Sequence, residues 1–84
     1  MNPQDCIDYI NRNYVRMTEA RRRLQMNHVN NAQYYLLRSN LFVTIGGCLF
    51  IHLEDLLALE RAIEASGLAP LDYLRKTYMT KEAA

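Results

Sequence analysis

The sequence predicts a mainly α-helical single domain that contains one small β-hairpin. The chain has 84 residues, a length that suits one domain. Apolar residues recur at helical spacing over most of this length. The stretch LFVTIGGCLFI at 41–51 differs, because two adjacent glycines separate two short runs rich in β-branched and aromatic residues. These observations indicate several helices around a single hairpin.

A first helix is expected near 3–13. The segment Asn-Pro-Gln-Asp at 2–5 is typical of a helix start, since asparagine caps, proline suits the first position and aspartate favours the positive end. Ile7, Ile10 and Tyr14 follow at 3-then-4 spacing, which predicts a buried apolar stripe.

The second helix is expected near 18–26, with Thr18 as its candidate cap. The alternative is one long helix that continues from the first, because the apolar spacing does not break. Three asparagines within 27–31 predict a turn, since asparagine bonds to its own backbone and tolerates left-handed geometry. A third helix is expected from Ala32 to Ser39.

The stretch 41–51 has two possible structures. A two-residue hairpin turn needs positive φ at both central positions, which Gly46 and Gly47 supply. In the alternative, the stretch is the apolar middle of a helical hairpin, where two adjacent glycines would cost about 2 kcal/mol relative to alanines. The hairpin is the favoured prediction.

Two further helices are expected in the last third of the chain. Leu53–Glu64 has a broad apolar face formed by Leu53, Leu56, Leu57, Leu59 and Ile63. Gly67 is the candidate C-terminal cap of this helix, and Leu68 is expected to pack back onto it. Pro70 begins a last helix through about Met79, and the final TKEAA is expected to fray.

Several of these segments resemble the excisionase and MerR-type winged helix-turn-helix DNA-binding family. The resemblance covers about 17–59 and lies in Met17-Thr18-Glu19-Ala20, Leu24, Met26-Asn27, Ile45-Gly46-Gly47, Ile51 and Glu54-Asp55-Leu56. Members often have glycine after that leucine, where this chain has Gln25. Their wing tips are often basic, whereas Ile45-Gly46-Gly47-Cys48 carries no charge.

The resemblance implies a winged helix-turn-helix core at 17–59, preceded by an N-terminal helix within 1–16 and followed by a C-terminal helix and tail at 68–84. Gly46 and Gly47 would form the turn of the wing. A recognition helix presents hydrogen-bonding side chains to base edges in the major groove. The candidates for base contact are Asn30, Asn31, Gln33 and Tyr34. In the alternative reading, the asparagines only form the turn and cap.

Charge is distributed unevenly, although the net charge is only +1. Between residues 12 and 38 there are six arginines against one glutamate, whereas 53–66 holds four acidic residues against one arginine. Arginines give DNA affinity through phosphate contacts. The candidates for phosphate contact are Arg21, Arg22, Arg23 and Arg38, and the alternative is an ordinary solvated helix face.

The leading hypothesis is a small cytoplasmic regulatory protein that binds double-stranded DNA, as a transcriptional regulator or an excisionase-like factor. One small module makes few contacts, so a homodimer is expected. The rival is a helical protein-interaction module that inhibits or adapts a protein partner. No enzyme activity, cofactor or metal site is expected, because the two histidines and two cysteines lack ligand spacing. No membrane partner is expected either, since the longest apolar run is far below the roughly 20 residues that span a bilayer.

Overall fold

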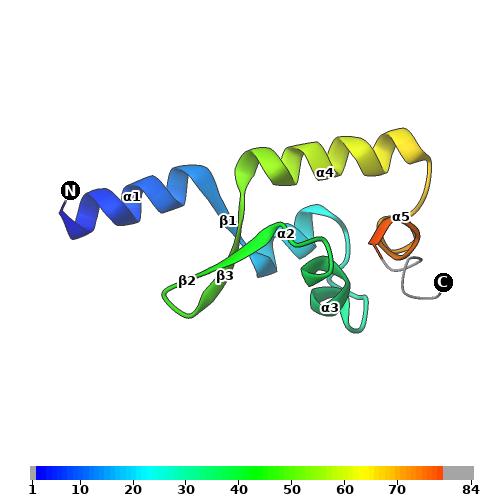
Figure 1. Ribbon diagram of the computed structural model, residues 1–84, viewed down its shortest axis with the longest axis horizontal. Helices are drawn as coiled ribbons and strands as arrows, with labels where there is room; N and C mark the ends of the chain where they lie inside the picture. The colour runs from blue at the N-terminus through cyan, green and yellow to red at the C-terminus, as the bar shows by residue number, and fades with distance from the viewer. Residues whose placement is uncertain (1, 79–84) are drawn as a thin grey trace.

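The computed structural model describes residues 2–78 and is mostly helical, with a three-stranded antiparallel sheet (Figure 1). The mainly α-helical fold with one small hairpin is therefore confirmed at this level. None of the helices within 2–78 is long and apolar enough to cross a membrane. The elements are α1 (Pro3–Asn13), β1 (Tyr14–Arg16), α2 (Met17–Arg23), α3 (Ala32–Leu37), β2 (Phe42–Ile45), β3 (Cys48–His52), α4 (Leu53–Ser66) and α5 (Pro70–Tyr78).

The hairpin prediction for 41–51 is confirmed. Strands β2 and β3 pair antiparallel, with Ile45 opposite Cys48 at the turn. Gly46 and Gly47 have φ of +56° and +81°. Positive φ at both central residues defines the primed turn whose twist matches that of the flanking strands. The helical alternative for this stretch is excluded in this structure.

Strand β1 was not expected from the sequence. It lies on the other side of β3, so the order in the sheet is β1-β3-β2, and Val15 is opposite Ile51. The helical spacing of Ile10, Tyr14 and Met17 hides this strand, because three residues are too few to show a period of two. Only the pairing with distant β3 defines β1 as a strand.

The core lies between one face of the sheet and four helices. Leu36 of α3, Ile51 of β3 and Leu56 of α4 are fully buried and come from three different elements. Leu74 of α5 is also fully buried. The predicted apolar face of α4 is confirmed for Leu56, Leu59 and Ile63, which are buried, whereas Leu53 and Leu57 are half-buried. The complete cluster is Met17, Ala20, Leu24, Met26, Ala32, Leu36, Ile51, Leu56, Leu59, Ile63 and Leu74.

Helix α1 does not join this core, so the predicted buried stripe is wrong. The helix has the predicted bounds and an Asn2 side-chain cap, but it buries no residue. Ile7 is 50% exposed, and Ile10 and Tyr14 are only half-buried. Figure 1 shows α1 projecting from the body, and the protein measures 47 × 23 × 22 Å. The apolar spacing predicted a helix correctly but not a partner for it.

The boundaries of α2 differ from the prediction at both ends. The helix begins at Met17, so Thr18 lies inside it, and no side chain caps its start. It ends at Arg23 rather than near 26, because Gln25 turns to φ +59°. The Met26 N–H then donates to Arg21 O at 2.8 Å, which closes a Schellman-type end.

Side-chain hydrogen bonds mark the end of α3, before the hairpin, and the start of α4, after it. Helix α3 stops at Leu37, two residues before the predicted end, and the Ser39 hydroxyl donates to Leu36 O at 2.6 Å. Helix α4 begins after the hairpin, where the Glu54 N–H donates to His52 Nδ1 at 3.2 Å.

Gly67 caps α4 with φ +73° as predicted, but Leu68 is 36% exposed rather than packed back. The predicted end of the last helix at Met79 and the TKEAA tail lie outside the described residues.

Candidate nucleic-acid interface

Helix α3 is held by its inner face against the core. Ala32 and Leu36 are buried, and Tyr35 is half-buried against the same cluster. The turn before α3 is fixed by Met26, which is buried and accepts a hydrogen bond from the Val29 N–H at 3.0 Å. Because the helix has only six residues, its outward face consists of a few side chains.

All four predicted base-contact residues are exposed at the beginning of α3. Asn30 and Asn31 precede the helix, whereas Gln33 and Tyr34 lie in its first turn. Asn31 has φ +65° and its side chain makes no capping hydrogen bond, so its amide does not serve as the cap that the sequence allowed. All four side chains are therefore exposed within one five-residue segment, and we call this set the α3 surface.

The two adjacent tyrosines of α3 differ in burial. Tyr34 is 50% exposed, whereas Tyr35 packs against the core. Their rings meet edge to face, with centroids 5.5 Å apart.

Sequence reasoning missed Leu37, which is 37% exposed. It lies three residues after Tyr34 and four after Gln33, and side chains at these spacings share a helix face. This spacing, which can be read from the sequence, would have placed Leu37 on the same helix face as Gln33 and Tyr34. An exposed leucine among amides gives the α3 surface an apolar patch, and apolar side chains can contact the methyl group of thymine.

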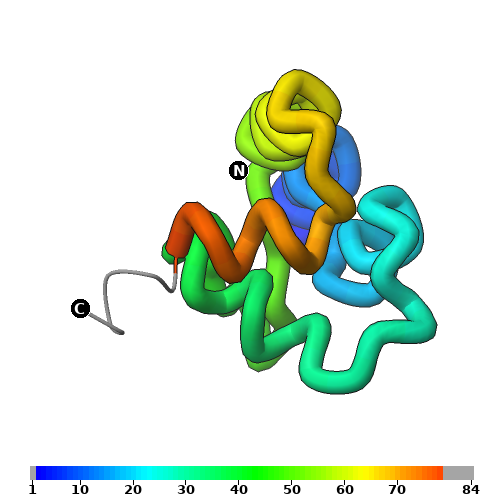
Figure 2. The backbone as a smooth tube through the Cα atoms, turned by 90° about the vertical axis from the view of Figure 1, so that its right-hand side faces the viewer, coloured from blue at the N-terminus to red at the C-terminus, as the bar shows by residue number. Residues whose placement is uncertain are grey.

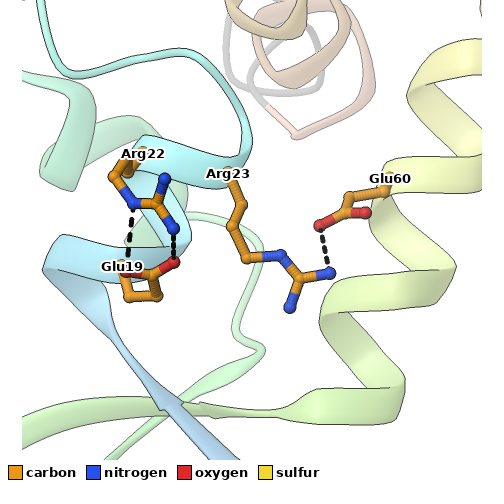
Figure 3. Close-up of polar contacts among 4 residues, drawn as sticks. All are labelled: Glu19, Arg22, Arg23 and Glu60. Atoms are coloured by element: carbon orange, nitrogen blue, oxygen red, sulfur yellow. Dashed lines mark hydrogen bonds and ion pairs between the residues drawn. The ribbon is translucent and has the colours of Figure 1, made fainter.

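Arg22 faces away from the core and is the most exposed of the three consecutive arginines. Its Nε donates to Glu19 Oε1 at 3.1 Å (Figure 3). This hydrogen bond lowers the pKa of Glu19, and the same contact raises the pKa of Arg22. Both groups are fully charged at neutral pH, and such exposed pairs contribute little to stability. A phosphate can therefore displace Glu19 from Arg22 at little cost.

Arg23 points to the other side of α2, towards α4. Its Nη2 lies 3.1 Å from Glu60 Oε1, and both side chains are 30% exposed (Figure 3). Glu60 Oε1 is buried and has no well-aligned hydrogen bond, so the attraction between the two is mainly one of charge. Arg23 is thus placed to join α2 to α4 rather than to contact DNA beside α3.

The other predicted contact residues differ in their exposure to solvent. Arg21 is half-buried, and its Nη2 donates to Asn27 O at 3.4 Å, in the turn that leads to α3. Arg38 is half-buried at the C-terminal end of α3. Gly46 and Gly47 are exposed at the tip of the hairpin, with no charged residue next to them. Of the four arginines, only Arg22 combines high exposure with an outward position.

The acidic helix and the α3 surface lie on different sides of the molecule. Figure 1 shows α4 along the top, with α3 and the tip of the hairpin below, and Figure 2 keeps this order after a 90° turn. Glu54, Asp55 and Glu64 are exposed on α4. A duplex placed against α3 would therefore lie away from the backbone of α4.

Comparison with protein-family models, curated proteins and solved structures finds no match to this chain. Its function has to be argued from its own residues.

Proposed function

We propose that the protein binds double-stranded DNA as a small regulatory protein of the winged helix-turn-helix kind. The main support is the α3 surface, which presents four exposed hydrogen-bonding side chains at the start of a helix that lies apart from the acidic helix α4 (Figure 1). The element order also supports it, since two consecutive helices are followed directly by a hairpin that extends the sheet of β1.

In this proposal α3 enters the major groove. Asn30, Gln33 and Tyr34 face base edges, and asparagine and glutamine can bond adenine through two atoms at once. Arg22 contacts phosphate after it leaves Glu19, and Arg21 supports the turn that orients α3. The hairpin tip carries no charge, so it would contribute shape rather than phosphate attraction. Arg23 does not take part, because Glu60 holds it on the other side of α2.

The test is binding of a fluorescent random-sequence duplex at increasing salt. A protein that neutralises phosphates loses affinity with a slope of about −0.9 per phosphate in a plot of log affinity against log salt. Arg22→Glu should weaken binding and flatten this slope. Arg61→Glu is the matched control, because it reverses an exposed charge on α4. Equal losses in both variants would mean that only net charge matters, and would contradict the assigned surface.

A second pair of variants tests the ion pair itself. Glu19→Gln releases Arg22 and should tighten binding to the same duplex. Glu64→Gln removes the same charge from the exposed face of α4 and should change affinity less. If Glu19→Gln weakens binding, Arg22 needs Glu19 to position it and does not exchange it for phosphate.

The rival function is a protein-interaction module, and one observation favours it. Helix α1 buries no residue and leaves Ile7 and Tyr9 half exposed, so their apolar surface is open to a protein partner. The duplex experiment separates the two functions. Binding that is absent even at low salt would reject DNA as the partner and leave the protein-interaction module.

A further inference from the structure

The outer edge of β2 pairs with no other strand in the part of the chain that the structure describes. Within residues 2–78, β2 has only β3 as a strand neighbour. The strand Phe-Val-Thr-Ile has four residues and carries neither charge nor proline. Proteins usually protect such edges with lysine, proline or a covering segment, because free N–H and C=O groups attract another strand.

The register shows which backbone groups are free. A two-residue primed turn makes its closing pair, Ile45 and Cys48, a hydrogen-bonded pair. Hydrogen-bonded pairs alternate along an antiparallel ladder, so Val43 and Phe50 form the next one. The backbone groups of Phe42 and Thr44 therefore point away from β3, towards the open edge.

The side chains of β2 also suit a strand partner. Val43 lies on the sheet face opposite the core and is 46% exposed. Phe42 lies on the other face and packs against the core. An incoming strand would form hydrogen bonds with Phe42 and Thr44 and would cover Val43 without meeting a charged side chain of β2 itself.

We propose that this partner is a second copy of the chain, and that the protein forms a homodimer in which two β2 strands pair antiparallel across a two-fold axis. In one register, Phe42 and Thr44 form hydrogen-bonded pairs with Thr44 and Phe42 of the partner subunit. This register joins every free group at these positions and puts Val43 opposite the partner's Val43. The strand is thus complementary to itself, as a two-fold interface requires.

The dimer would give the uncharged hairpin a role that does not involve phosphate. The sheets of the two copies would join into one six-stranded sheet, from the three strands of each copy. A two-fold dimer also presents two recognition elements, which suits palindromic DNA sites. The proposal stands apart from DNA binding, because it rests on the strand edge alone and is tested without DNA.

The first measurement is the mass in solution of the full chain, by light scattering after size-exclusion chromatography. The expected mass is twice the 9.8 kDa of one chain. Thr44→Pro removes only an outward N–H, which proline tolerates on an edge strand, and should give the single-chain mass with unchanged circular dichroism. Val43→Lys should do the same, since it places two like charges opposite each other.

The matched control is Ile7→Lys, which puts the same charge on another half-exposed apolar residue, in α1. This variant should keep the mass of two chains. Dissociation by Ile7→Lys but not by Val43→Lys would place the contact on α1 and overturn the proposal. A single-chain mass for the unaltered protein at every concentration tested, or a mass above two chains, would also overturn it.

Disulfide trapping tests the register. Both native cysteines are free and exposed, so Cys6→Ser and Cys48→Ser form the background. In that background Val43→Cys should form a cross-linked dimer on oxidation, because directly opposite residues in a non-hydrogen-bonded pair lie close together. Thr44→Cys should cross-link poorly, since it is not opposite its own copy. The reverse preference would overturn this register.

Discussion

At the scale of single residues, three residues within 2–78 that are not glycine have backbone conformations that usually belong to glycine. Gln25, Asn31 and Asn40 have φ of +59°, +65° and +60°. Asparagine tolerates this region because its short side chain can bond to the local backbone, but glutamine gains no such compensation. Gln25 therefore stores strain at the end of α2.

Gln25→Gly should stabilise the fold by about 1 kcal/mol, because glycine adopts positive φ without the steric cost of a Cβ atom. Asn40→Gly is the matched variant and should gain less. Both are measured as free energies of unfolding in urea. Equal gains would show that residue type does not matter at these positions, and a loss in Gln25→Gly would show that the glutamine side chain contributes contacts that outweigh the strain.

At the scale of elements, His52 connects the sheet to α4 in two ways. Its Nδ1 accepts the Glu54 N–H, and its ring lies edge-on to Tyr14, with centroids 5.2 Å apart. His52→Asn can keep the cap but loses the ring, whereas His52→Phe keeps an aromatic ring but loses the cap. A lost N-cap costs about 1 kcal/mol. We expect His52→Phe to be the less stable variant in thermal unfolding, and the opposite order would make the contact with Tyr14 the dominant one.

The turn of the hairpin depends on backbone conformation alone. A Cβ atom at Gly46 would meet no atom within 4 Å, so crowding cannot explain the glycine. Gly46→Asn should leave the melting temperature nearly unchanged, because Asn-Gly suits a primed turn. Gly46→Val should cost more than about 1 kcal/mol, since a β-branched residue resists positive φ. Equal melting temperatures would contradict the primed turn.

Elements with local signals could be predicted from the sequence, and those defined by distant partners could not. The hairpin was predictable because Gly46 and Gly47 define its turn by themselves. Strand β1 was missed because β3, the strand with which it pairs, lies more than thirty residues away along the chain. The same distinction applies to the candidate site. The exposed amides before α3 follow from the turn, whereas only the folded structure pairs Arg23 with Glu60.

At the scale of the whole molecule, stability should be unevenly distributed. The buried cluster joins α2, α3, β3, α4 and α5, so these elements open only together. Helix α1 contributes nothing to this cluster, and its eleven residues are too few for a stable isolated helix in water. Its hydrogen bonds are therefore expected to open independently of the rest.

Native-state amide hydrogen exchange tests this distribution directly. Amides within α1 should exchange through local opening at a small free-energy cost, whereas those of Ile51, Leu56 and Leu59 should approach the free energy of global unfolding. Pairing of β2 edges in a dimer would slow exchange at Thr44 but not in α1, because the proposed contact does not include that helix. If α1 amides instead exchange as slowly as those of α4, another surface covers Ile7 and Tyr9 in solution. Because the sample contains no other protein, that result would place a second copy of the chain on α1 and would contradict the arrangement in which α1 remains exposed.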